Sequence, residues 1–231
     1  MLLFEDDDFF VLNKPPYIAT LDERHADKSA SMLRMAREYH PDAQAGHRLD
    51  KETSGALVFA KHPEAYRHIS LQFEHRRVGK IYHAVSGGIH EFDDVLVNLP
   101  ILPMKTGGVK IDRQEGKEAE TLFRTLDIYR SASLIACMPF TGRMHQIRIH
   151  LQCLKAPIVM DFLYGGQEIY LSQIKRKFKL ARNTEEQPLI QRVALHARSL
   201  SFENLKGEPV EAQAPYPKDM AALIRQLELN R

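Results

Sequence analysis

Apolar and polar positions in the first third of the chain predict a strand, a helix, a second strand and a second helix. Residues 9–12 form an apolar run that ends at Asn-Lys-Pro-Pro, which is typical of a buried strand followed by a turn. Apolar residues between 32 and 39 recur at helical spacing after Ser31, and Pro41 ends that segment. The apolar run 56–60 predicts a strand, and spacings of three and four predict a helix from Pro63 to about His75.

The remaining pattern contains more strands than helices. Residues 80–85 alternate, which places Lys80 and Tyr82 on the same strand face. Residues 118–128 and 133–138 predict a strand pair, and an apolar stripe predicts a helix after Thr141. Residues 194–202 predict a strand that returns through a turn at 206–207 to 210–212. Because strands and helices do not alternate regularly, we expect an α+β fold with a mixed, mostly antiparallel sheet flanked by helices.

The chain length fits one large domain or two small ones, because 231 residues can bury a sizeable core. We expect a single domain over residues 1–231, in which the polar, basic segment 165–192 is an insertion or a mobile arm. No apolar run approaches the roughly 20 residues of a membrane helix. Four acidic residues near the N-terminus argue against an export signal. These features predict a cytoplasmic protein that does not insert into membranes.

Cysteine and histidine positions predict neither a disulfide nor a metal site. Cys137 and Cys153 do not form a CxxC pair, so we expect two reduced thiols in the core. The eleven histidines contain no HxxxH or HExxH spacing. His145 and His150 are five residues apart and would point in different directions on a helix.

Positive charge is concentrated in two segments, although the net charge is only +2. Clustered cations favour contacts with phosphate groups. Each cluster alone is equally consistent with a solvated charged face. The first cluster contains Arg67, His75, Arg76, Arg77 and Lys80, and the second contains Lys175, Arg176, Lys177, Lys179 and Arg182.

The polar segment 46–55, bounded by glycines, predicts a loop between a helix and a strand. Such loops place reactive groups at the edge of a rigid scaffold. Asp50 lies between Arg48 and Lys51, whose charges favour an ionised carboxylate. By local physics alone, an aspartate that caps a turn is the more economical interpretation.

Two further segments carry candidate chemistry. Tyr82 could stack on a nucleobase while Lys80 meets a phosphate, although for this segment alone an aromatic residue packed in the core is the better interpretation. Thr141 could cap the following helix and place Arg143 in its first turn, where anions are favoured. There Arg143 could hold a carboxylate or phosphate bidentately, or it could be an ordinary surface arginine.

Taken together and in this order, these segments resemble the RluA-type family of rRNA and tRNA pseudouridine synthases. The similarity covers roughly residues 4 to 217. Its longest motifs are residues 47–55 and 141–151. The shorter matches are Asn-Lys-Pro at 13–15, Lys-x-Tyr at 80–82, residues 161–165 and Leu-His-Ala at 195–197.

The resemblance implies an isomerase that turns a uridine of RNA into pseudouridine without a cofactor or metal. Asp50 would be the essential carboxylate, acting either on the anomeric carbon or as a base at the 2′ position. Arg143 would hold Asp50 across a central catalytic cleft, and Tyr82 would stack on the flipped base. Lys80 would support this constellation or a nearby phosphate.

The resemblance also assigns RNA-binding positions. Arg48 would enter the RNA stack as the uridine leaves it, because filling the vacancy offsets part of the flipping cost. Leu195 would line the base pocket, and His47 belongs to the aspartate motif. Lys175 and Arg176 would contact RNA from the basic segment.

Relatives often carry a small N-terminal RNA-binding domain, for which twelve residues before Asn13 leave no room. RNA selection would then fall to the catalytic domain, and we expect a monomer. Two other functions are weighed. A non-catalytic RNA-binding or ribosome-assembly factor is disfavoured because Asp50, Tyr82 and Arg143 are all present. A glycosidase would pair Asp50 with Glu52 in a motif that is not typical of glycosidases.

Overall fold

The computed structural model describes residues 1–22, 30–105, 107–180 and 183–231. The chain divides into two compact units. Unit 1 contains residues 1–82 and 196–215, and unit 2 contains residues 83–195 and 216–231. Both units are therefore built from two separate stretches of sequence. The single domain expected from the sequence stays a prediction.

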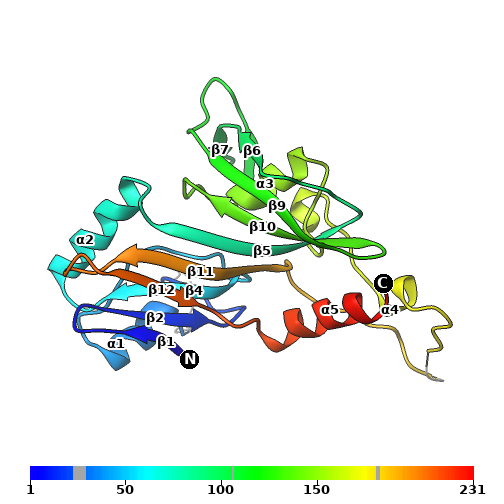
Figure 1. Cartoon of the computed structure of the whole chain (residues 1–231), viewed down its shortest axis with the longest axis horizontal. Helices are drawn as coiled ribbons and strands as arrows, with labels where there is room; N and C mark the ends of the chain where they lie inside the picture. Colours follow the sequence, from blue (N-terminus) through cyan, green and yellow to red (C-terminus); the bar gives the residue numbers. More distant parts are fainter. Residues whose placement is uncertain (23–29, 106, 181–182) are drawn as a thin grey trace. The chain divides into compact units, whose positions relative to one another are not determined.

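Unit 1 is a mixed sheet with one helix on each face (Figure 1). Its strands follow the order β1-β2-β4-β11-β5, with β3 added to β4 and β12 to β11. β2 and β4 pair antiparallel, whereas β4 and β11 pair in parallel. The bounds are β1 (Leu2–Glu5), β2 (Phe9–Lys14), β3 (Gln44–Ala45), β4 (Ser54–Ala60), β5 (Gly79–Gly87), β11 (Leu195–Glu203), β12 (Pro209–Gln213), α1 (Met32–Tyr39) and α2 (Pro63–Glu74).

Alternation along β2 and β4 explains why both faces of this sheet are apolar. Phe9 and Val58 face a cluster that includes Ala65 and Ile69 of α2. Residues with the opposite parity form a second cluster with Met32 and Ala36 of α1. Because successive side chains of a strand point to opposite faces, a continuous apolar run is what a strand between two helices requires.

Unit 2 contains β10, β9 and β6, which follow β5 in the strand order β5-β10-β9-β6, and a separate pair of strands, β7 and β8. β5 itself runs from unit 1 into unit 2, because the division falls between residues 82 and 83. β9 pairs antiparallel with both β10 and β6. The bounds are β6 (Val95–Asn98), β7 (Ile101–Pro103), β8 (Val109–Ile111), β9 (Glu120–Ile128), β10 (Ala132–Pro139), α3 (Gln146–Cys153), a short 3-10 helix (Phe162–Tyr164), α4 (Leu171–Ile174) and α5 (Lys218–Leu229).

The predicted α+β class is confirmed, and so are most elements of residues 9–85. α1 starts after Ser31, whose hydroxyl accepts a hydrogen bond from Arg34 N–H at 3.1 Å. Pro63 opens α2 as its first residue. The final helix α5 is not among the predicted elements. Neither are β1, β6, β7, β8 and α4.

Two predictions are wrong in detail. Thr141 does not cap α3, because the helix begins at Gln146 after His145, so Arg143 precedes the first turn instead of lying in it. Both cysteines are free thiols, but only Cys137 is buried, whereas Cys153 at the end of α3 is exposed. No helix in the described ranges is long and apolar enough to cross a membrane.

Candidate functional site

The loop that carries Asp50 is held by side chains on both sides of the carboxylate. Thr20 forms two hydrogen bonds with Leu49, the residue before Asp50. The Thr20 hydroxyl donates to Leu49 O at 2.8 Å and accepts from Leu49 N–H at 3.0 Å. The Asp50 carbonyl accepts a hydrogen bond from Thr53 N–H at 3.0 Å. Asp50 itself is half-buried. The backbone is thus fixed while the residue stays partly exposed, an arrangement suited to a reacting group.

Lys14 anchors the other side of this loop. Its side chain is fully buried, and Nζ donates to Lys51 O and to Pro15 O, each at 3.0 Å. A buried ammonium is costly unless hydrogen bonds compensate it, and here backbone carbonyls supply them. Lys14 therefore joins the Asn-Lys-Pro turn to the Asp50 loop. The sequence motif contained this residue without indicating this role.

Tyr82 lies close to Asp50 within unit 1. Its ring packs against the apolar cluster that contains Leu49. Burial raises the pKa of the Tyr82 hydroxyl well above its usual range, and the nearby negative charge of Asp50 raises it further. Tyr82 is consequently protonated at neutral pH. The structure brings these two predicted residues together.

His47 and Lys80 form a second group beside the same loop. Burial lowers the pKa of Lys80 to about 8, and the positive charge of Arg76 contributes. Burial, together with the charge of Lys80, lowers the pKa of His47 to about 3. Nε2 of His47 accepts a long hydrogen bond from Val58 N–H at 3.4 Å, consistent with a neutral imidazole. The unit therefore places a neutral imidazole and the cationic groups of Lys80 and Arg76 near one another.

In unit 2, the turn that carries Arg143 is fastened by the buried side chain of Gln146. The amide oxygen accepts from Arg143 N–H at 3.0 Å and from the Thr141 hydroxyl at 2.7 Å. The amide nitrogen donates to Glu120 O and to the Thr121 hydroxyl, each at 2.9 Å. Gln146 thus ties the turn to β9, and sequence reasoning missed it because its neighbours made a helix cap by Thr141 the simpler interpretation.

The guanidinium of Arg143 is exposed, and its Nε donates to Glu118 O at 3.0 Å. Two residues later, His145 has a positive φ of 51° and bonds through Nδ1 to the Tyr164 hydroxyl at 2.9 Å. The same hydroxyl accepts from Val109 N–H at 2.9 Å. Tyr164 therefore supports the turn from its helical end and links it to the β7–β8 pair.

A buried ion pair lies behind this turn. Asp161 is 1% exposed and accepts two hydrogen bonds from Arg148, at 2.7 and 2.8 Å. The Arg148 guanidinium also lies 5.1 Å from the centre of the Tyr164 ring. Bidentate pairing fixes both side chains, so the segment 161–165 supports α3. The sequence analysis identified residues 161–165 as similar to the family but predicted no role for them.

Leu195 is buried at the start of β11. A fully buried guanidinium holds its backbone: Arg192 donates to Leu195 O and Val193 O, each at 3.2 Å. Arg192 also forms a bidentate ion pair with Asp219 of α5, at 2.7 and 3.1 Å. The position of Leu195 is thus set by a helix that the sequence did not predict.

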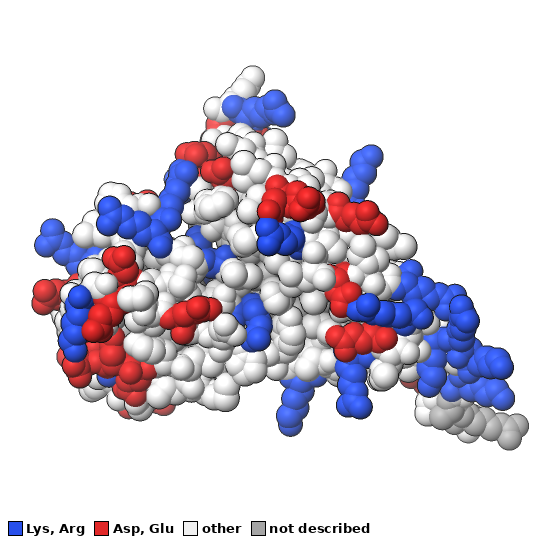
Figure 2. All heavy atoms as spheres, in the orientation of Figure 1, with Lys and Arg blue, Asp and Glu red and all other residues white. Residues whose placement is uncertain are grey.

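The remaining predicted RNA contacts are exposed. Arg48 precedes the buried Leu49 and is solvent-accessible. Lys175 ends α4, and Arg176 follows it, both exposed. Figure 2 shows Lys and Arg gathered over α4 and the segment that follows it. Arg182, assigned to the same basic cluster, lies outside the described residues.

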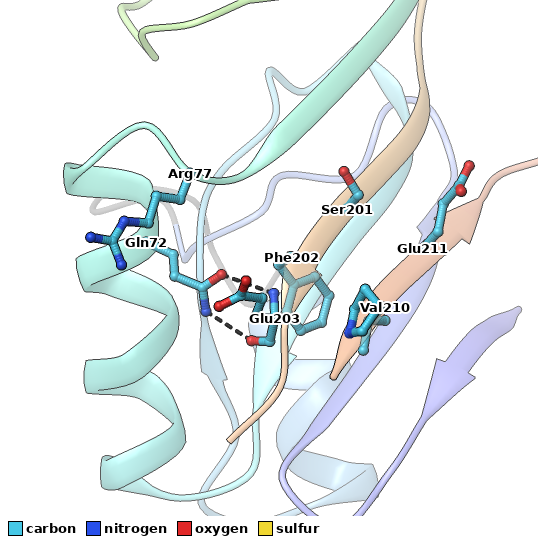
Figure 3. A pocket seen from close by; sticks show the side chains of 8 residues that line it. Gln72, Arg77, Ser201, Phe202, Glu203, Val210 and Glu211 are labelled. Atoms are coloured by element: carbon cyan, nitrogen blue, oxygen red, sulfur yellow. Dashed lines mark hydrogen bonds between the residues drawn. The ribbon is translucent and has the colours of Figure 1, made fainter. Parts of the chain in front are cut away.

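A pocket in unit 1 lies away from these residues. It is formed between α2 and the β11–β12 hairpin, where the Gln72 side chain bonds both backbone groups of Glu203, at 2.8 and 2.9 Å (Figure 3). Its lining contains none of the residues that the sequence predicted for catalysis. In the described part of the chain, no three His, Cys, Asp or Glu residues are grouped as metal ligands would be.

Comparisons with known proteins connect this geometry to one family. Residues 8–153 match the RNA pseudouridylate synthase family. The chain is 31% identical to ribosomal large subunit pseudouridine synthase C of Vibrio vulnificus, over the whole chain and 70% of the relative. It is also 31% identical to the dual-specificity RNA pseudouridine synthase RluA of the same organism, over 89% of the chain and 78% of the relative.

A solved structure supports the fold. Human RNA pseudouridylate synthase domain containing 4 aligns over 98% of the chain and 92% of its own length, with a TM-score of 0.72 and 22% identity. At that identity the likeness concerns the fold alone.

Proposed function

Because the chain belongs to the RluA-type family of RNA pseudouridine synthases, we propose that it isomerises a uridine of RNA through the carboxylate of Asp50. The observation that carries this proposal is the pairing of Asp50 with Tyr82 beside a loop anchored on both sides. Such a loop holds a reactive oxygen in one place before the substrate arrives.

The reaction conserves all atoms of the nucleoside. The bond between ribose C1′ and uracil N1 breaks, the base turns, and C1′ bonds to C5 instead. The proton on C5 is removed, and N1 ends with a proton. The target nucleotide must leave its helix before a side chain can reach C1′.

Asp50 acts in one of two ways. As a nucleophile, it attacks C1′ while the uracil anion departs, and C5 later displaces the carboxylate. As a base, it removes the proton from C2′ while the uracil anion leaves C1′, which gives a glycal. The carboxylic acid then returns the proton to C2′ as C5 attacks C1′. Both routes require an ionised Asp50 at the outset.

Tyr82 serves first as a surface for the base and later in the removal of the C5 proton. The raised pKa of its hydroxyl keeps it protonated while Asp50 is charged. By both routes Asp50 is ionised again once the bond between C1′ and C5 has formed. Tyr82 therefore takes part in removing the C5 proton as a protonated hydroxyl, which can pass on its own proton as it accepts the one from C5.

The other predicted residues complete the proposal. Arg143 holds the carboxylate or the adjacent phosphate, and Lys80 supplies a nearby positive charge. Arg48 occupies the space that the flipped uridine leaves, and Leu195 contacts the base. His47 stays neutral at the edge of the site, and Lys175 and Arg176 contact the RNA backbone.

The names of the relatives suggest the substrate. Large-subunit rRNA is the first candidate, because several relatives are named for it, and a dual-specificity relative makes a second RNA class the next to examine. We propose that the protein acts as a monomer in the cytoplasm, where these RNAs are accessible. Mapping pseudouridine in total RNA from cells with and without the gene identifies the position.

Asp50→Ala tests the central claim. With RNA carrying tritium at C5 of uridine, tritium release should stop in this variant while RNA binding persists. Glu52→Gln, which removes the adjacent exposed acid, should release tritium at the wild-type rate. Full activity of Asp50→Ala would exclude the proposed carboxylate. Wild-type protein that binds RNA but never releases tritium would instead point to a non-catalytic RNA-binding factor.

A further inference from the structure

Tyr17 has a backbone conformation that tyrosine rarely adopts. Its φ is 68°, in the left-handed region where a Cβ crowds the backbone and glycine is preferred. In the described part of the chain, no other tyrosine or phenylalanine has a positive φ. Strain of this kind persists where the surroundings impose it, and it concentrates at functional sites.

The turn that carries Tyr17 is hydrogen-bonded to the same lysine that holds the Asp50 loop. Tyr17 belongs to the turn that follows Asn-Lys-Pro, and Pro15 O of that turn accepts from Lys14 Nζ at 3.0 Å. The same ammonium donates to Lys51 O at 3.0 Å. A single buried group therefore joins the backbone two residues before Tyr17 to the backbone one residue after Asp50.

The side chain of Tyr17 lies largely outside the core, so core packing does not account for its strained backbone. It is 52% exposed, whereas Ile18 beside it packs against the apolar cluster of α1. An exposed aromatic ring on a rigid turn is suited to stacking, because little side-chain freedom is lost on binding. Unpaired nucleobases of RNA stack on such rings irrespective of sequence.

We propose that Tyr17 is a stacking platform for an unpaired RNA base next to the target uridine. This inference rests on the proposed function, since it supplies an additional contact for the same substrate. The ring holds a neighbouring nucleotide while the target turns. Tyr17 thus contributes to RNA binding, and the reaction at Asp50 does not require it.

Tyr17→Gly and Tyr17→Phe test the proposal, each in the Asp50→Ala background so that the RNA stays unmodified. The probe is a short fluorescent single-stranded RNA of mixed sequence. Tyr17→Gly should raise Kd about tenfold, because one stacked base is lost, whereas Tyr17→Phe should stay within about twofold. Tyr66→Ala, which removes an exposed tyrosine of α2, should bind as the parent does.

Two controls separate stacking from other roles. The difference between the parent and Tyr17→Gly should disappear on an RNA of equal length with abasic nucleotides. The urea midpoint of Tyr17→Gly should equal or exceed that of the parent, because glycine adopts this φ without a Cβ penalty. Unchanged affinity, an equal loss in Tyr17→Phe, or a lowered midpoint would overturn the proposal.

These outcomes are distinguishable from failure of the proposed function. If Asp50→Ala retained tritium release, the chemistry would be wrong, yet the base-dependent effect of Tyr17→Gly on binding could still be measured. If Asp50→Ala lost activity and Tyr17→Gly bound normally, only the stacking proposal would be wrong.

Discussion

The loop of Asp50 and the turn of Arg143 are both held by hydrogen bonds from buried polar side chains. These side chains differ in how far along the sequence they lie from the segment they hold. Lys14 and Thr20 reach the Asp50 loop from 37 and 29 residues away. Gln146 reaches the Arg143 turn from three residues away. The first arrangement exists only when β2 and β4 have paired, whereas the second forms largely within one segment that docks on β9. A reactive group can thus be preorganised either by tertiary structure or by local structure.

Replacing Lys14 should have the largest effect, because it removes the long-range hydrogen bond that holds the Asp50 loop. Lys14→Met removes the donor that joins the carbonyls of Pro15 and Lys51, which costs roughly 1–3 kcal/mol of unfolding free energy and at least about a hundredfold in kcat. Urea unfolding and tritium release at saturating RNA measure the two effects. Lys206→Met, at a lysine whose side chain is 63% exposed, should change neither. A wild-type kcat in Lys14→Met would show that the loop holds itself.

Replacing Gln146 should have the next largest effect and should spare the Asp50 loop. Gln146→Leu removes the acceptor of Arg143 N–H and the donor to Glu120 O, with a cost of roughly 1–3 kcal/mol. We expect kcat/KM to fall about tenfold or more, since the turn loses its fixed geometry. Gln146→Glu keeps the acceptor but not the donor, so it should lie between the two. Equal activity of all three proteins would separate the turn from catalysis.

Thr20 provides a smaller, isosteric test of the long-range fastening. Thr20→Val removes the hydroxyl that binds both backbone groups of Leu49, and we expect a loss of about 1–2 kcal/mol with a moderate drop in kcat. Thr20→Ser retains the hydroxyl and should recover most of the loss. If Thr20→Ser were as impaired as Thr20→Val, the methyl group and its packing would be the important part.

The smallest effect is a pH dependence near the Asp50 loop. The pKa of Lys80 is lowered to about 8, so between pH 8 and 10 the folded protein releases a proton that the unfolded chain still binds. The unfolding free energy of wild type relative to Lys80→Met should therefore rise with pH across this window. Chemical unfolding of both proteins at several pH values measures the slope. If the difference in unfolding free energy between the two proteins did not change with pH, the Lys80 ammonium would be solvated and its pKa would not be lowered.

The sequence predicted the parts of the fold that are determined locally. Apolar runs and alternation located β2, β4 and β5, and Ser31 and Pro63 marked helix starts, because these signals act within one element. The start of α3 was misplaced, because the hydroxyl of Thr141 accepts from Glu120 N–H on another strand at 3.0 Å instead of capping the helix. That choice depends on tertiary contacts that a local pattern does not contain.

The candidate site shows the same division. Asp50, Tyr82 and Arg143 came from motif resemblance, which carries information that residue patterning lacks. Lys14 and Gln146 were visible within those motifs, but their roles were not, because each binds backbone groups of residues that only folding brings close. Tyr17 gave no signal at all, since a positive φ at a tyrosine cannot be read from composition or spacing.

The discontinuous composition of unit 1 also bears on its synthesis. When a ribosome has added residue 195, Asp50, Tyr82 and Arg143 have all been made, yet the segment 196–215 of unit 1 is still missing. Until it emerges, β4 lacks the parallel neighbour that meets it at Gly55, where an added Cβ would lie 2.2 Å from Ala197 O. The nascent enzyme therefore carries its reactive residues beside an open strand edge, which closes only when the segment 196–215 has been added.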